Sequence, residues 1–341
     1  MKGKNSIHTI AKELGVSATT VSLVLNGVGK ENRLSNELIE KIQKHLRKID
    51  YQPNVLAQAL RTGRTNVIGM LVEDISDPFF SAIARGVEIG LEDSGYNIFF
   101  MITKNKLENS ILRLDTLKGY NVDGYIIAPP PGSEKEIEKL ISLSKPVVLY
   151  DRYFPSLDTC NVAVDNREGA YGGVMELINN NYKQVAFVTL LSNQMQMADR
   201  KSGYIAVISQ IIQSTGLVLE VPYNLDMASA SRMIKDFLVK NKNIDAVFFG
   251  TNYLAVSGIR ALRELGLKIG QDIGVVGFDD DTNFAFFSPA VTVVAQPEIE
   301  ISRTIVKNIL SALSTNNICL SGTTLLPTKL IKRESSQKTA G

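Results

Sequence analysis

The chain has 341 residues, with 37 basic and 35 acidic side chains and 44% apolar residues. This length predicts two or three domains, and the absence of any run of about eighteen apolar residues argues against a membrane span. Two lysines near the start are not followed by the apolar segment of a signal peptide, so we expect a cytoplasmic protein.

Residues 8–27 predict two short helices joined by a tight turn at Gly15-Val16-Ser17, with Ser17 capping the second helix. The spacing of the apolar residues packs the helices at a steep angle, the helix-turn-helix arrangement. A plain helical hairpin is the alternative. The inward residues are Ile10, Ala11, Leu14, Val16, Val21, Val24 and Leu25. The outward residues of the second helix are uncharged types that can enter a major groove: Ala18, Thr19, Ser22 and Leu23.

Charge separates the first residues from the rest. Residues 1–65 carry eleven basic and five acidic side chains, and the remaining chain carries 26 basic and 30 acidic ones. A basic segment on an acidic body indicates a surface for phosphate and favours DNA over the hairpin alternative.

A third helix is predicted from a cap at Ser35 to about Lys48. After a break at 51–54, residues 55–61 can form only a two-turn helix, which is marginal alone in water. Residues 62–65 form a polar hinge.

From Val67 onward, short apolar strands alternate with amphipathic helices, which predicts parallel sheets. Because seven or more strands exceed one such sheet, we expect two Rossmann-like lobes. The fold class is therefore an N-terminal all-α head plus an α/β body of two parallel-sheet lobes. The predicted strands are 67–72, 98–102, 124–128, 147–150, 185–190, 246–250 and 273–278. The predicted helices lie near 79–94, 107–118, 134–143, 168–181, 198–213, 228–241, 253–265 and 297–314.

Polar and aromatic residues follow four predicted strands, where ligands bind in open α/β sheets. Carboxylates and amides there can take paired hydroxyls, arginine adds a bidentate donor, and rings cover an apolar sugar face, which predicts a polyol site. Each residue alone also suits a helix cap or the core. The residues are Asp77, Phe79, Phe80, Asp151, Arg152, Thr251, Asn252, Asp279 and Asp280.

Little in the body indicates catalysis or a bound metal. Both histidines, His8 and His45, lie in the basic head, which argues against a Ser-His-Asp centre and most transition-metal sites. Asp279-Asp280-Asp281 lacks the further oxygen ligands of a calcium loop. Cys160 and Cys319 have no nearby partner in sequence and are expected to be reduced thiols. We expect neither a cofactor nor an enzyme.

From about His8 to Ser335 the chain resembles the LacI/GalR family of bacterial transcription regulators. The resemblance rests on a series of motifs in order rather than on the helix-turn-helix alone. They are Thr9-Ile10, Gly15-Val16-Ser17, Thr20-Val21-Ser22, Leu25-Asn26-Gly27, Tyr51, Pro53-Asn54, Ala57, Leu60 to Thr65, Asp77 to Phe80, Asp151-Arg152, Val164-Asp165-Asn166, Arg200, Gly203-Tyr204, Gly277 to Asp280, Pro289, Thr292, Gln296-Pro297 and Arg333-Glu334-Ser335.

The resemblance implies a body like a periplasmic sugar-binding protein, with the chain crossing between lobes near 163–166, 290–296 and 324–328. It also implies a homodimer on a pseudo-palindromic double-stranded operator, without a membrane partner. The expected parts are a DNA-binding domain 1–52, a hinge helix and linker 53–65, a body 66–335 and a tail 336–341. Within the body, the N-lobe is about 66–163 and 291–325, and the C-lobe about 164–290 and 326–335.

The resemblance assigns two sets of contacts. A leucine of the hinge helix, matched by Leu60, enters the minor groove. The expected DNA contacts are Ser17, Ala18, Thr19, Ser22, Leu23, Asn26, Tyr51, Asn54, Ala57, Gln58 and Leu60. The expected effector contacts are Asp77, Phe79, Phe80, Asp151, Arg152, Arg200, Thr251, Asn252, Asp279 and Gln296.

Two departures from the family pattern bear on specificity. Leu23 replaces a reader that is often polar or basic and can touch a thymine methyl. Thr251-Asn252 stands where Asn-Asp is usual in the family, so the carboxylate of that aspartate is absent here. Because Arg152 and Arg200 are both present, this absence favours an anionic effector such as a sugar acid.

The sequence therefore predicts a transcription repressor whose operator affinity is controlled by a small sugar-like or sugar-acid effector. Induction and corepression both fit. A solute-binding protein of transport is the alternative, and it requires a signal peptide and no DNA head.

Overall fold

The structure, a computed structural model, describes residues 6–51, 63–315 and 321–339. The chain forms two compact units, Met1–Thr65 and Asn66–Gly341. The predicted hinge helix and Cys319 lie outside the described residues.

The head contains three helices, α1 (Ile7–Leu14), α2 (Ala18–Leu25) and α3 (Asn36–Lys48). Ser17 and Ser35 cap α2 and α3, each accepting a hydrogen bond from a backbone N–H three residues later, which confirms both predicted caps. Gly15 ends α1 with φ of 69°, a conformation that glycine adopts without steric cost. The buried core residues come from all three helices: Ile10, Ala11, Val21, Val24, Ile42 and Leu46.

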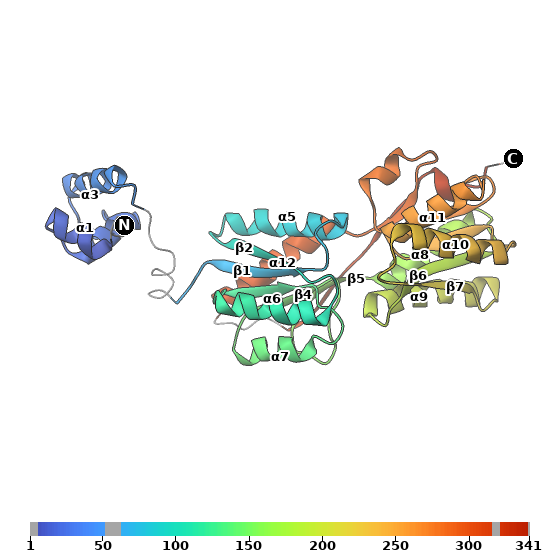
Figure 1. The fold of residues 1–341 in the computed structure, drawn as a ribbon, viewed down its shortest axis with the longest axis horizontal. Helices are drawn as coiled ribbons and strands as arrows, with labels where there is room; N and C mark the ends of the chain where they lie inside the picture. The colour runs from blue at the N-terminus through green and yellow to red at the C-terminus, as the bar shows by residue number, and fades with distance from the viewer. Residues whose placement is uncertain (1–5, 52–62, 316–320, 340–341) are drawn as a thin grey trace. The chain divides into compact units, whose positions relative to one another are not determined.

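The first lobe of the body is built on a parallel sheet in the order β11-β5-β4-β3-β1-β2. Helices α5 (Pro78–Glu92) and α12 (Glu298–Ser314) cover one face, and α6 (Leu107–Gly119) and α7 (Glu134–Ser142) cover the other (Figure 1). Side chains of successive strand residues alternate between these two layers. The strands are β1 (Val67–Val72), β2 (Asn97–Ile102), β3 (Gly124–Ile127), β4 (Val147–Tyr150), β5 (Cys160–Val164) and β11 (Gly322–Leu326).

The second lobe repeats this plan with the order β12-β10-β9-β8-β6-β7, in which only β12 runs antiparallel. Helices α8 (Asn166–Asn179) and α9 (Met195–Val207) pack on one face, and α10 (Met227–Lys240) and α11 (Asn252–Glu264) on the other. The strands are β6 (Val185–Leu191), β7 (Leu217–Pro222), β8 (Ala246–Phe249), β9 (Gly274–Phe278), β10 (Thr292–Ala295) and β12 (Lys329–Ile331). Short helical turns lie at η1 (Ile208–Ile212), η2 (Thr282–Phe286) and η3 (Glu334–Ser336).

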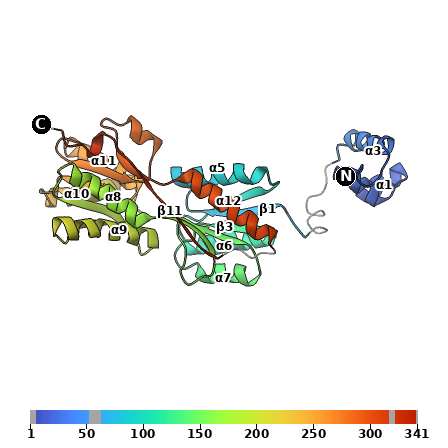
Figure 2. The ribbon, with the colours of Figure 1, turned by 180° about the vertical axis from the view of Figure 1, so that it is seen from behind.

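The chain passes between the lobes after β5, after β10 and between β11 and β12 (Figure 2). The second passage comes later than the boundary expected at 290/291, because β10 pairs with β9 and so belongs to the second lobe. Thr292 fixes that strand, since its hydroxyl contacts the Arg333 carbonyl and the Ser336 hydroxyl.

Five strands were missing from the sequence prediction, namely β5, β7, β10, β11 and β12. β10 and β12 have only four and three residues, and the other three have a physical reason. β5 carries the polar Asn161 inside the sheet, where its amide bonds Thr159 and Thr323. β7 is an edge strand that contains Glu220, which pairs with Lys201. β11 is also an edge strand, and its residues up to Leu325 are exposed. None of these strands has the continuous apolar character of β1 or β4.

Within the described ranges, the helices are too short or too polar to cross a bilayer.

The closest approach of α8 and α9 depends on Gly203. A Cβ atom there would lie 2.2 Å from the Arg167 carbonyl oxygen, a backbone atom that cannot turn aside. We expect Gly203→Ala to lower the free energy of unfolding by about 2–3 kcal/mol, as overpacking does. Urea unfolding followed by circular dichroism measures this loss.

Gly172 provides the matched control, because it lies in α8 and a Cβ there meets nothing within 4 Å. Gly172→Ala should stabilise the body by about 0.5–1 kcal/mol through helix propensity. Equal effects of the two substitutions would contradict the packing argument.

Candidate functional site

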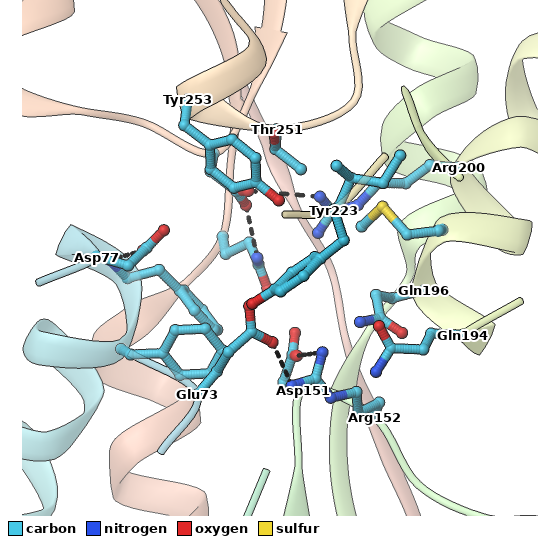
Figure 3. Close-up of a pocket in the computed structure, with 16 residues that line it drawn as sticks. Glu73, Asp77, Asp151, Arg152, Gln194, Gln196, Arg200, Tyr223, Thr251 and Tyr253 are labelled. Atoms are coloured by element: carbon cyan, nitrogen blue, oxygen red, sulfur yellow. Dashed lines mark hydrogen bonds and ion pairs between the residues drawn. The ribbon is translucent and has the colours of Figure 1, made fainter. Parts of the chain in front are cut away.

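A polar pocket lies between the lobes at the carboxyl ends of both sheets (Figure 3). All of the predicted effector contacts except Asn252 line it, together with residues that the sequence prediction missed. The lining is Glu73, Asp77, Phe79, Phe80, Asp151, Arg152, Leu190, Gln194, Gln196, Met197, Arg200, Tyr223, Thr251, Tyr253, Asp279 and Gln296.

Asp77 enters the pocket from the first lobe as the N-cap of α5. Its Oδ1 accepts a hydrogen bond of 2.9 Å from the Phe79 backbone N–H. Burial, reinforced by the charge of Asp279, raises the pKa of Asp77 from 3.8 to about 7. The buried rings of Phe79 and Phe80 meet edge to face with centroids 5.1 Å apart, giving the pocket an apolar wall.

A buried ion pair joins Arg152 to Glu73 in the first lobe. The Tyr223 hydroxyl, which comes from the end of β7 in the second lobe, donates to the other Glu73 oxygen. Arg152 also lies 3.6 Å from Asp151, and burial raises the pKa of that carboxyl to about 6. Burial and the Glu73 charge raise the pKa of Tyr223, so this hydroxyl stays a donor.

Arg200 organises the second lobe's side of the pocket. Its Nε donates to Asn166 at 2.8 Å, and Nη1 donates to the Gly250 carbonyl at 2.7 Å and to Asp279 at 3.4 Å. The guanidinium lies 3.6 Å from the ring centroid of Phe278, an additional cation–π contact. Gln296 donates to the other Asp279 oxygen at 2.6 Å.

Asp151 and Asp279 occupy equivalent places after β4 and β9. Both adopt the left-handed backbone region, with φ of 66° and 70°. Aspartate tolerates this region better than most residues, because its short side chain can bond locally. Each strand end thus turns sharply while keeping a carboxyl group in the pocket.

Asn252 does not line the pocket, although it was predicted as an effector contact. Thr251 caps α11 by accepting from Leu254, and Asn252 is the buried first residue of that helix, with Oδ1 bonded to the Tyr253 N–H. Tyr253 lines the pocket instead. Successive side chains of an α-helix point in different directions, so Tyr253 faces the pocket and Asn252 does not.

The paired arginines do not support the expected preference for an anionic effector. Arg152 and Arg200 each have carboxylate partners, and the pocket is lined by four carboxyl groups against these two guanidiniums. The missed residue Glu73 makes this difference. It is the first residue after β1, so the strand-end position that selected Asp77 marks Glu73 as well.

Amide side chains also join the lobes at the pocket's edge. Gln194, before α9, and Asn105, after β2, exchange two hydrogen bonds of 3.1 Å. Gln194, Arg152 and Tyr223 also line a second cavity between the lobes.

The three consecutive aspartates have separate roles. Asp279 lies in the pocket, Asp280 accepts two hydrogen bonds from Arg333, and Asp281 caps η2. In the part of the chain that the structure describes, no cluster of three or more His, Cys, Asp or Glu residues could hold a metal ion.

The head presents its predicted DNA contacts on and around α2. Thr19, Ser17 and Asn26 are exposed, and Leu23 is half-buried without belonging to the head's core cluster. Ala18 and Tyr51 pack partly against that core, and Ser22 accepts a bond from Asn26. Asn54, Ala57, Gln58 and Leu60 lie outside the described residues.

The raised pKa of Asp77 predicts how stability depends on pH. Between about pH 4 and 7 the folded body holds a proton on Asp77 that the unfolded chain does not, so this contribution is lost as pH rises through 7. Asp77→Asn keeps a capping oxygen and removes the titration. We expect the variant to be more stable than the wild type by about 1–2 kcal/mol at pH 8, with the difference vanishing toward pH 4. Thermal unfolding at several pH values measures it.

Asp226 provides the control, because it also caps a helix but has its pKa lowered by hydrogen bonds from Ser229. Asp226→Asn should give no gain at pH 8. A gain of the same size in both variants would rule out the proposed role of burial at Asp77.

Each unit matches a known protein family over part of its length. Residues 6–54 match the family of bacterial regulatory proteins described as the lacI family, and residues 174–336 match a periplasmic binding protein-like domain. The HTH-type transcriptional regulator RegA of Clostridium saccharobutylicum is 30% identical over 336 residues, covering 97% of this chain and 99% of RegA. The regulator KdgR of Bacillus subtilis is 30% identical, covering 91% and 93% of the two chains.

Solved structures share the fold. The Lac repressor dimer bound to operator and an anti-inducer superposes with a TM-score of 0.85 at 21% identity, covering 98% of this chain and 99% of that one. The regulator CelR in complex with cellobiose gives a TM-score of 0.69 at 22% identity, covering 97% and 99%. The helix-turn-helix head, the two-lobed body and the near full-length likeness to RegA agree: this chain belongs to the LacI family of DNA-binding transcriptional regulators.

Proposed function

We propose that this regulator is a cytoplasmic repressor whose affinity for an operator is controlled by a small polyol bound between the lobes. The observation that carries the proposal is the pocket itself. It joins carboxyl, amide and guanidinium groups with the rings of Phe79 and Phe80, which suits a hydroxylated ring with one apolar face. CelR in complex with cellobiose supports a carbohydrate ligand.

The proposed effector contacts are the predicted residues without Asn252, with Glu73, Gln196, Tyr223 and Tyr253 added. Every charged residue among them has a structural partner or a cap role, so we propose binding rather than catalysis and no enzymatic activity.

The proposed base readers are Ala18, Thr19 and Leu23 on α2. They are uncharged, and the half-buried Leu23 offers an apolar surface suited to a thymine methyl. Ser17, Ser22, Asn26 and Tyr51 are proposed to contact phosphates or support α2. The excess positive charge of residues 1–65 supplies the attraction to DNA.

We propose the domain division 1–52, 53–65 and 66–339, with the second passage between lobes moved to follow Ala295. The expected boundary of a tail at 336 is not kept, because Ser336 is buried and the Thr339 N–H donates to the Gly270 carbonyl. Asn54, Ala57, Gln58 and Leu60 are proposed as contacts of a segment that wedges Leu60 into the minor groove. An apolar wedge there kinks the duplex.

We also propose that the protein binds its pseudo-palindromic operator as a homodimer. The first lobe ends in the edge strand β2, which exposes more than a third of Phe99 and Phe100. Exposed apolar rings on an edge strand are typical of an interface. The Lac repressor forms a dimer on its operator.

The DNA proposal is tested with an operator selected by the full chain from a random DNA library. Leu23→Ala should weaken binding to this operator by about 1–2 kcal/mol, the worth of one base contact, and leave binding to unrelated DNA unchanged. Fluorescence anisotropy at a fixed salt concentration measures both affinities.

Leu143→Ala, at a leucine 63% exposed on the body, is the matched control and should bind as the wild type does. Residues 66–341 alone should bind neither DNA. Equal losses on operator and unrelated DNA in Leu23→Ala would assign Leu23 a structural role only.

The dimer proposal predicts that the double variant Phe99→Glu, Phe100→Glu dissociates. Charges in an apolar interface are poorly solvated, so the dimer dissociation constant should rise at least about tenfold. Analytical ultracentrifugation measures it. Ile211→Glu, at a residue 49% exposed in the second lobe, is the control. An unchanged dimer in the double variant would move the interface elsewhere.

A further inference from the structure

We propose that the effector carries a positively charged amine on its polyol, and that this ammonium group faces Asp77. This inference rests on the proposed function, because it names the chemical class of the molecule bound between the lobes.

The first observation is that the pocket's cations are already paired. Arg152 is held by Glu73 and Asp151, and Arg200 is held by Asn166, the Gly250 carbonyl and Asp279. Both guanidinium charges are therefore balanced by carboxylates, and only the Nε of Arg152 remains as a buried donor without a partner in the described chain.

Asp77 is the carboxyl group of the pocket that takes part in none of these pairs. Across the described residues it makes no ion pair, and its bond to the Phe79 N–H uses only one of its oxygens. The charges that act most strongly on it are those of Asp279, Glu73 and Asp151, all of the same sign. A bound cation would remove this repulsion.

The second observation is an excess of hydrogen-bond acceptors. Gln296 donates its Nε2 to Asp279, which fixes the amide orientation and leaves Oε1 without a partner in the described chain. Gln196, only 4% exposed, also has an unpartnered Oε1 and lies on the pocket wall (Figure 3). Buried acceptors of this kind require a donor. An ammonium group has three donors and no acceptor.

A bare metal ion does not fit these residues. The described chain contains no cluster of three or more acidic, histidine or cysteine groups that could hold one. The acceptors are spread over both lobes, and the Phe79 and Phe80 rings form an apolar wall, so the cation must be part of a larger organic molecule.

The test uses matched sugars that differ in one group: glucosamine, glucose and glucuronate, and the corresponding galactose set. Isothermal titration at millimolar ligand measures affinity, and anisotropy on the selected operator measures the response. We expect each amine to bind at least about tenfold more tightly than its neutral partner, as a charge-assisted hydrogen bond provides, and the acids to bind most weakly.

Asp77→Asn retains the cap of α5 and should reduce the amine-to-neutral affinity ratio to near one. Asp226→Asn, at a capping aspartate outside the pocket, should leave the ratio unchanged.

The outcomes separate the two proposals. Tighter binding of neutral or acidic sugars, or no binding by any amine, overturns the inference, and a neutral sugar that alters operator affinity would leave the proposed function intact. Amine binding that depends on Asp77 supports the inference whether or not operator affinity changes. If the amine binds and operator affinity stays the same, the proposed control of the operator by this effector is overturned instead.

Discussion

The buried ion pair between Glu73 and Arg152 is the interaction on which the pocket depends. Taking two charges out of water is costly, and their attraction offsets the cost only when further hydrogen bonds satisfy both groups. Asp151 assists Arg152, and the Tyr223 hydroxyl assists Glu73. Because Tyr223 belongs to the second lobe, the first lobe's charge pair is completed only by contact between the lobes. The same pair consumes the guanidinium that would otherwise attract an anion.

The sequence allowed much of this site to be predicted, because parallel sheets bring their carboxyl ends to one edge. Asp77, Asp151 and Asp279 each follow a strongly apolar strand, so the sequence alone predicted their position in the pocket. Glu73 directly follows β1 and has the same strand-end signal, but it was overlooked in favour of the family motif at Asp77. Tyr223 could not be predicted in this way, since it follows β7, an edge strand interrupted by Glu220. Gln196 lies on a helix, and only the packing of α9 against the pocket selects it. Arg152 pairs with Glu73, and Arg200 with Asp279, each about eighty residues away in the chain. Pairing at such a distance in sequence has no local signature, which is why the charge balance was misjudged.

The head was easier to predict because its rules are local. Ser17 and Ser35 cap helices through bonds three residues away, and the inward residues repeat at helical spacing. Its small core is formed by three short helices, so packing determines which residue types occupy the inward positions of α2. The outward side chains of α2 are free of that packing and can be selected for the base edges that they meet.

A ligand changes a conformational equilibrium only to the extent that it binds one arrangement better than another. Asp77 comes from the first lobe, whereas Gln196 and Gln296, whose Oε1 atoms have no partner in the described chain, come from segments of the second. A cation that contacts both sets gains its full binding energy only at one spacing of the lobes, while a ligand confined to one lobe would gain the same energy at any spacing. The distribution of unpaired acceptors across the lobes therefore couples the binding of an amine to the arrangement of the body, and that coupling is what control of the head requires.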